Sequence, residues 1–200
     1  MTHTVQLAWQ EFAADSVRFD DQVILVTGAA GGIGSALTKA FATRGATVIM
    51  LDKKQRQLEK LYDELCSVGA TEPVILPADL SQINAENTVS LVDGLEQDFG
   101  KLNGLIHNAA ELGVLAPMDQ YDLQQWSTIM QVNLHAPYLL TRALLPLLKK
   151  ARNSRVLYTT ADSATQPSAF WGAYAIAYAG VETQMRLWHE ELENTTDLWF

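Results

Sequence analysis

The sequence predicts an α/β fold in which a doubly wound, Rossmann-like parallel sheet lies between two layers of helices. Two observations predict it. Short apolar runs alternate along the chain with amphipathic segments of about 12 or more residues, the pattern of repeated βαβ units. A glycine-rich turn, G-x-x-x-G-x-G, joins the first apolar run to the first amphipathic segment. Right-handed crossovers then place helices on both faces of the sheet, which makes three layers. The strand order expected for this Rossmann-like fold is 3-2-1-4-5, with a partial or missing sixth strand.

The elements follow from this alternation. Five strands are expected at 22–27, 47–51, 73–76, 102–107 and 155–159, and a sixth begins at 198. Helices are expected at 32–44, 54–68, 84–98, 122–149 and 172–194. Ser81 is a candidate cap for the third helix, and Pro137 predicts a kink within the fourth. Residues 1–20 are expected to form an arm that ends with partial helix and packs on the sheet edge.

Composition narrows the class of protein. Two hundred residues with 48% hydrophobic content and no repeat or linker predict one domain, residues 1–200. A net charge of −9 argues against a nucleic-acid surface and against polybasic membrane attachment. The sequence has no apolar run long enough for a membrane span, and residues 1–20 lack the uninterrupted hydrophobic region of a secretory signal. Cytoplasmic residence is therefore the expectation. The single cysteine, Cys66, is expected to be a buried apolar group and cannot form an internal disulfide.

The glycine-rich turn predicts a dinucleotide site. Gly28 permits the tight turn, Gly32 lets backbone N–H groups approach a phosphate, and Gly34 allows close packing of helix and strand. Asp52 ends the second strand, where a carboxylate accepts hydrogen bonds from ribose hydroxyls and repels the 2′-phosphate of NADP. NAD is therefore favoured, with NADP possible because Lys53 follows directly. Alternatively, the glycines only form an ordinary turn, and Asp52 only precedes the start of a helix.

Five motifs in order resemble the classical short-chain dehydrogenase/reductase family from residue 20 to residue 195. They are the turn 27–34, Asp79-Leu80, Asn108-Ala109-Ala110, Asn133 and Tyr174. The segments 107–110, 130–133 and 171–175 look most like the YciK-type bacterial oxidoreductases. The resemblance implies NAD(P) binding and hydride transfer to or from a small carbonyl or alcohol substrate.

The resemblance also implies which residues contact the cofactor. They are Thr27, Gly28, Gly32, Ile33, Gly34, Asp52, Asp79, Leu80, Asn108 and Ala109. Asp79 and Leu80 would contact the adenine ring, and Asn108 would brace the turn after the fourth strand. Alternatively, Asp79 only caps the turn that follows it. Ala110 departs from the glycine that the family usually has at that position.

The family's catalytic tetrad is altered. Tyr174 matches the proton-transferring tyrosine and Asn133 the helix asparagine that holds a water. Four residues after Tyr174, where the family has lysine, stands Tyr178, and the serine position is Ala161. Thr160 is a candidate replacement for the serine if the loop is shifted by one residue, although strand alternation opposes this.

The missing lysine affects the chemistry directly. A phenol of pKa near ~10 is ionised in only about one molecule in a thousand at neutral pH. A cation about 5 Å away, at an effective dielectric of about 20, would contribute roughly 3 kcal/mol toward ionisation. Two functions therefore stay open: an oxidoreductase with an altered tetrad, or a catalytically impaired pseudoenzyme that acts as a nucleotide-binding or dimerisation partner. Tyr178 is expected to serve in packing. For Tyr174 and Asn133, a catalytic role and a purely structural role are equally expected.

Partners and metals complete the expectations. The resemblance implies a homo-oligomer formed through the helices 122–149 and 172–194. No metal site is expected, because His107 and His135 lack a carboxylate or cysteine cluster with ligand spacing. The chain stops where the family continues to a substrate lid, so the substrate is not predicted beyond its class.

Overall fold

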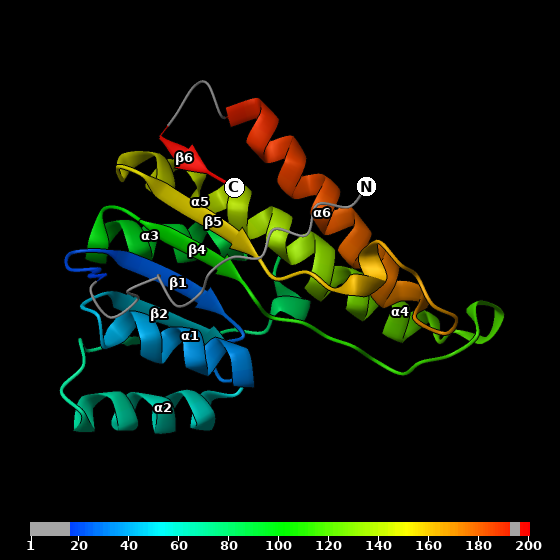
Figure 1. Cartoon of the computed structure of the whole chain (residues 1–200), viewed down its shortest axis with the longest axis horizontal. Helices are drawn as coiled ribbons and strands as arrows, with labels where there is room; N and C mark the ends of the chain where they lie inside the picture. The colour runs from blue at the N-terminus through cyan, green and yellow to red at the C-terminus, as the bar shows by residue number, and fades with distance from the viewer. Residues whose placement is uncertain (1–16, 193–196) are drawn as a thin grey trace, which may run out of the picture.

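The computed structural model describes residues 17–192 and 197–200, and it contains one six-stranded parallel sheet (Figure 1). The strand order is β3-β2-β1-β4-β5-β6, which confirms the predicted fold and shows the sixth strand as a short edge. The strands are β1 Val23–Thr27, β2 Thr47–Asp52, β3 Val74–Pro77, β4 Gly104–His107, β5 Ser154–Tyr158 and β6 Leu198–Trp199. Parts of the predicted arm (1–16) and of the last predicted helix (193–194) lie outside the described residues.

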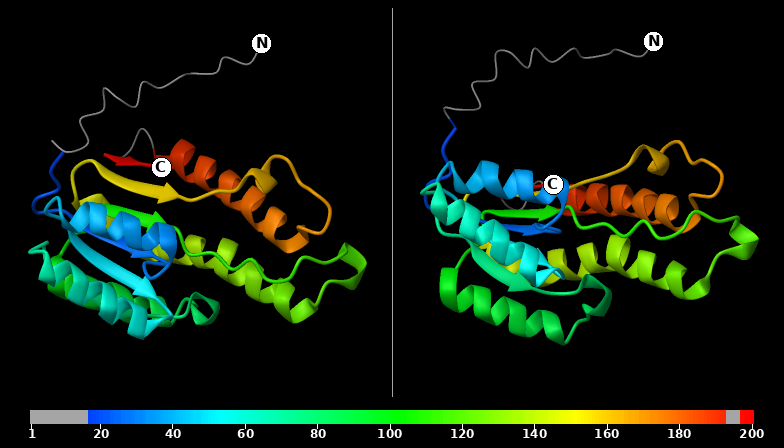
Figure 2. Two further views of the ribbon diagram at one scale, coloured as in Figure 1. Left: turned by 60° about the horizontal axis from the view of Figure 1, so that its bottom comes forward. Right: turned by 90° about the horizontal axis from the view of Figure 1, so that it is seen from below.

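Helices cover both faces of the sheet (Figure 2). They are α1 Gly32–Ala42, α2 Gln55–Ser67, α3 Asn87–Phe99, α4 Leu123–Met130, α5 Ala136–Lys150 and α6 Gly172–Leu192. The pair α1 and α2 lies on one face, and α3 and α5 lie on the other, with α6 beside α5. The helix pair α4–α5 and α6 extend beyond the end of the sheet (Figure 1).

Strand alternation produces two hydrophobic cores, one on each face. All five residues of β1 are buried, as expected for a central parallel strand. Val23 and Leu25 point into the core shared with α3 and α5, whereas Ile24 and Val26 point into the core shared with α1 and α2. These four residues therefore anchor both helical layers and fix the position of the turn that follows.

The helix predicted at 122–149 is divided by a π-helical segment, Gln131–His135, between α4 and α5. The irregularity follows from Pro137. Proline lacks the N–H that would bond the carbonyl four residues earlier, and its ring crowds that carbonyl. The residue four before Pro137 is Asn133, at the centre of the π segment. The kink predicted at Pro137 is thus expressed one turn earlier, as a widened turn around Asn133.

Two local predictions were wrong. Cys66 is exposed, because α2 buries the stripe Leu58, Leu61 and Leu65, and Cys66 lies about 100° round the helix from Leu65. Ser81 does not cap a long helix, since it lies in a 3₁₀ turn, Leu80–Gln82. The chain enters α3 through Asn84, whose side-chain oxygen accepts from the N–H groups of Glu86 and Asn87.

Across the described ranges, 17–192 and 197–200, no helix combines the length and apolar character that crossing a membrane requires. Nor do these residues include a group of three or more histidine, cysteine or acidic side chains placed to hold a metal ion.

Candidate cofactor site

A cavity of about 680 Å³ lies at the carboxyl ends of the central strands. Its lining comes from the turns after β1, β2, β3 and β4 and from one residue of the π segment. The lining includes Gly28, Gly31, Gly32, Ile33, Asp52, Lys53, Lys54, Asp79, Leu80, Asn108, Ala109, Glu111 and Val132. Ligands of doubly wound sheets bind at this edge, so the fold and the cavity agree on the location.

The three glycines predicted for the turn differ in what requires them. Gly28 has φ +65°, and a Cβ there would lie 2.8 Å from Ala109 Cα. A Cβ on Gly34 would lie 2.1 Å from the carbonyl oxygen of Gly28, so close packing of α1 on the turn demands glycine. A Cβ on Gly32 would meet nothing within 4 Å. The space beside Gly32 is therefore open to a ligand, and no packing contact requires glycine at this position.

The N-terminus of α1 opens into this cavity. Its N-cap is Gly31, and no side chain caps the first turn. The backbone N–H groups of the first turn are thus available to a ligand, and the helix dipole favours an anion there.

Thr27 and Asn108 fasten the turn to the neighbouring strand. The buried Thr27 Oγ1 donates to the carbonyl of Ile106 and accepts from the N–H groups of Asn108 and Ala109, at 3.0 and 3.1 Å. Asn108 Nδ2 donates back to the carbonyls of Thr27 and Gly28. The Thr27 hydroxyl is occupied inside the protein, so its contribution to cofactor binding is to position the turn.

The two carboxylates predicted to face the adenosine are already engaged with backbone. Asp52 Oδ2 accepts from the N–H of Ala30 and Oδ1 from that of Lys54, at 3.1 and 2.9 Å. These bonds orient the carboxylate toward the glycine turn and leave further lone pairs for ribose hydroxyls. Asp79 Oδ1 caps the next turn through the N–H of Ser81 at 2.9 Å, which is the alternative role expected for it.

Asn133 is buried, 2% exposed, and binds the loop that follows β4. Its Oδ1 accepts from the N–H of Glu111 at 2.8 Å, and its Nδ2 donates to the carbonyl of the same residue at 2.9 Å. The π segment thereby places Asn133 where it clamps the backbone of Glu111 at the rim of the cavity. This reciprocal pair corresponds to the structural reading of Asn133.

Tyr174 and Tyr178 form an aromatic pair in the first half of α6, with ring centroids 4.6 Å apart. Tyr178 is 4% exposed, and burial followed by the adjacent Tyr174 phenol raises its pKa above the ordinary value. Trp171 packs against Tyr174 at 5.7 Å. None of these rings lines the cavity that holds the glycine turn.

Thr160, the candidate substitute for the family serine, binds elsewhere. Its hydroxyl donates to Glu182 Oε1 at 2.7 Å, two turns beyond Tyr174 on α6. The other oxygen of Glu182 pairs with Arg186 at 3.5 Å. Lys150 pairs with Glu96. Two of the cations nearest in sequence to the altered tetrad are thus already paired with carboxylates.

Comparison with known proteins now places the chain. The family model described as short chain dehydrogenase matches residues 22–196. The chain belongs to the short-chain dehydrogenase family. The sheet order agrees with the fold that the resemblance implied, and this match confirms the family.

Several relatives of this family resemble the chain closely. The uncharacterized oxidoreductase YciK of Escherichia coli (strain K12) is 34% identical over 174 residues, 87% of this chain and 69% of YciK. A short chain dehydrogenase structure from Salmonella enterica serovar Typhi has a TM-score of 0.85 and 35% identity, covering 90% of this chain and 73% of that one. An Escherichia coli CFT073 protein of the same description, complexed with NADPH, has a TM-score of 0.85 and 34% identity, covering 90% and 74%. The chain thus spans about 70% of the length of these relatives.

Two features of this short-chain dehydrogenase were not expected from its sequence. The first is a buried polar chain behind β4 and β5. His107 Nε2 lies 2.8 Å from Thr141 Oγ1, which lies 2.9 Å from the Tyr158 hydroxyl. Burial lowers the pKa of His107 to about 3 and raises that of Tyr158 to about 12, so both are neutral at physiological pH. No spacing rule joins these three positions, because the sheet and α5 bring them together.

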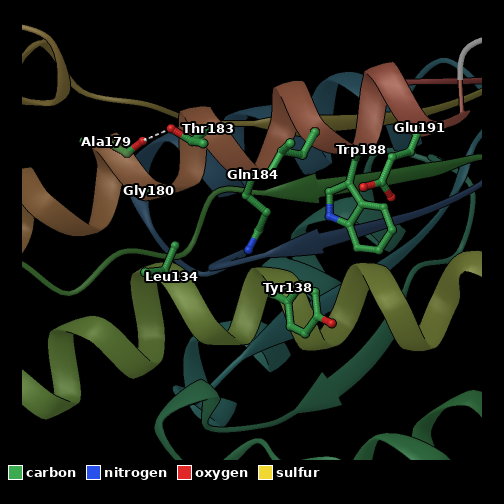
Figure 3. Close-up of a pocket in the computed structure, with 9 residues that line it drawn as sticks. Leu134, Tyr138, Ala179, Gly180, Thr183, Gln184, Trp188 and Glu191 are labelled. Atoms are coloured by element: carbon green, nitrogen blue, oxygen red, sulfur yellow. Dashed lines mark hydrogen bonds between the residues drawn. The ribbon is translucent and has the colours of Figure 1, made fainter.

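The second is a groove of about 730 Å³ between α5 and α6 (Figure 3). The side chains of Tyr138, Gln184 and Trp188 meet there, and the Gln184 amide points from α6 toward α5. The Trp188 ring stacks on Tyr138 at 6.0 Å and on Phe200 at 6.1 Å. The groove lies between the two helices through which the family resemblance implies self-association.

Proposed function

We propose that this chain binds a nicotinamide dinucleotide along the carboxyl edge of its sheet. The main support for this proposal is the cavity at the uncapped N-terminus of α1, where Gly32 leaves open space beside the first-turn N–H groups. The residues fit the cofactor: the helix N-terminus suits the pyrophosphate, and the Asp52 carboxylate suits ribose hydroxyls. The NADPH complex of the related Escherichia coli protein supports the same ligand class.

The reaction proposed is hydride transfer to or from a small carbonyl or alcohol, which is the chemistry the family's cofactor supplies when bound. In this chain Tyr174 would exchange the proton with the substrate oxygen. Asn133 would position the active-site loop through its bonds to Glu111. Thr160 would be the remaining hydroxyl near the serine position, once released from Glu182.

A second function is favoured by one specific observation. Tyr178, at the lysine position, is a buried neutral phenol with a raised pKa, and Ala161 has no hydroxyl. Tyr174 therefore lacks the neighbouring cation that favours loss of its proton, and loss of an oxyanion donor alone costs about 10²–10³ in rate. Such a chain would act as a pseudoenzyme that binds nucleotide or pairs with an active relative.

Titration of NADH and NADPH by energy transfer from tryptophan tests the binding. We expect saturable binding of at least one of them, with NADH favoured by Asp52. Absence of binding by both would overturn the cofactor proposal for either function. Gly94→Ala, on α3 with nothing within 4 Å of the added Cβ and away from the cavity, serves as the handling control.

Turnover with a panel of carbonyl substrates separates the two functions. Robust wild-type turnover would contradict the pseudoenzyme, whereas activity that appears only in Ala161→Ser/Tyr178→Lys would support it. Because Tyr178 is buried, Tyr178→Phe is the packing control, and both variants are compared after their unfolding midpoints are measured.

The same proposal includes self-association through α5 and α6, the helices predicted at 122–149 and 172–194. The groove between them carries exposed apolar side chains, Tyr138 at 43% and Leu187 at 56%. Exposed apolar surface of this kind marks interaction sites.

A further inference from the structure

Lys53 and Glu111 lie on opposite sides of the cavity mouth and meet across it. Lys53 follows β2 directly, and Glu111 lies in the loop after β4. Since β2 and β4 are the two neighbours of β1, a bond between these side chains spans the end of β1, where the glycine turn begins. Lys53 Nζ lies 3.2 Å from Glu111 Oε2, and both residues line the cavity.

Glu111 is held in place by its backbone. Asn133 binds both its N–H and its carbonyl, so the carboxylate is presented from a fixed point of the rim. Lys53, by contrast, carries its ammonium on a flexible chain whose side chain is 53% exposed, against 36% for Glu111. Of the two partners, the lysine is therefore the one free to exchange.

The charges around the cavity make that exchange consequential. Three carboxylates, from Asp52, Asp79 and Glu111, and two ammonium groups, from Lys53 and Lys54, line it. Asp52 sits where the adenosine ribose is expected and repels a 2′-phosphate, while Lys53 is the adjacent cation that would attract one. As long as Glu111 neutralises Lys53, Lys53 attracts a 2′-phosphate less strongly, while Asp52 still repels it.

Resting on the proposed cofactor binding, we propose that Glu111 is a specificity-determining residue. It withholds Lys53 from the 2′-phosphate and so lowers the affinity for NADP(H) relative to NAD(H). The ion pair opens when a cofactor bearing a 2′-phosphate binds, and the ammonium moves from the carboxylate to the phosphate. Glu111 thereby acts through Lys53 and needs no contact with the cofactor.

The test is a double-mutant cycle on the full chain with NADH and NADPH as probes. Glu111→Gln keeps the backbone bonds to Asn133 and frees Lys53. An exposed ion pair is worth up to about 1 kcal/mol, so NADPH affinity should rise up to about fivefold relative to NADH affinity. In the Lys53→Gln background the same substitution should leave the preference unchanged. Raising the ionic strength should shrink the gain, because exposed charges are screened.

Glu64→Gln is the matched control. It breaks an exposed ion pair of the same kind, Glu64 with Lys39 at 2.6 Å, on helices whose paired residues do not line the cavity. It should not alter cofactor preference. Equal gains for NADH and NADPH, or a gain that persists without Lys53, would overturn the inference while leaving cofactor binding intact. If neither probe binds any variant, the proposed function fails together with it.

Discussion

Thr27 joins two strand ends through a single hydroxyl. Its Oγ1 takes part in three hydrogen bonds to backbone groups of Ile106, Asn108 and Ala109 while 1% exposed. Replacing it with Val keeps the shape but leaves two partly buried N–H groups and one buried carbonyl with a lost partner. Such a loss costs about 1–3 kcal/mol of unfolding free energy.

We therefore expect Thr27→Val to lower the urea midpoint clearly and to weaken NADH binding. Thr43→Val is the control, since the Thr43 hydroxyl bonds the carbonyl of Lys39 on the exposed end of α1. An unchanged midpoint for Thr27→Val would show that the hydroxyl does not fasten the turn.

His107 makes stability depend on pH. Its pKa is about 3 in the folded protein because of burial, whereas an unfolded histidine titrates near ~6.5. Below about pH 6.5 the unfolded chain takes up a proton that the folded chain refuses, so stability from this group falls by about 1.4 kcal/mol per pH unit. Its full contribution is present above that pH and is lost progressively toward pH 3.

Urea unfolding between pH 7.5 and 5 measures this slope. His107→Gln retains a donor for Thr141 but cannot titrate, so its stability should vary less with pH than the wild type. His135→Gln is the control, because His135 is a histidine with an exposed side chain. Parallel curves for wild type and His107→Gln would contradict the assignment.

At the scale of elements, the β1–turn–α1 unit distinguishes packing glycines from ligand glycines. A Cβ at position 34 meets the carbonyl of Gly28 at 2.1 Å, so Gly34→Ala should cost about 3 kcal/mol or more by overpacking. Gly32→Ala meets no protein atom, so it should fold normally and bind NADH more weakly. Unfolding midpoints and cofactor titrations of the two variants should therefore give opposite patterns.

The contrary outcome is equally defined. If Gly32→Ala binds NADH as the wild type does, the pyrophosphate does not approach the first turn of α1. Normal stability of Gly34→Ala would instead show that α1 can move away from the turn without loss.

At the scale of the whole molecule, α5 and α6 form the surface proposed for self-association. Leu187 is 56% exposed on the groove between them. A buried Glu side chain at an interface is costly, so Leu187→Glu should convert dimer to monomer in light scattering. Val89→Glu, at a 58% exposed position of α3, should leave the mass unchanged. A wild type that is monomeric at all concentrations would remove this part of the proposal.

The sequence alone predicted the strand order, which the structure confirms, and the place where the cofactor site is expected. Local rules suffice there, because buried runs such as 23–27 set the strands and the glycine turn marks the dinucleotide-binding form of the doubly wound sheet, whose usual strand order begins 3-2-1-4-5. Gly28, Gly34 and Asp52 were predictable for the same reason, since each follows directly from its own strand or turn. Cys66 was not, because a helix's buried stripe depends on which side the sheet lies.

Only the tertiary structure decided which side chains meet across the fold. The pairings of Asn133 with Glu111, Lys53 with Glu111, and His107 with Thr141 join positions 22, 58 and 34 residues apart. No periodicity encodes such contacts, since they depend on the register of parallel strands and on the π turn before Pro137. The sequence predicted a cofactor site at the glycine turn, and the three-dimensional contacts define which charges surround the cavity there and what each catalytic candidate is bound to.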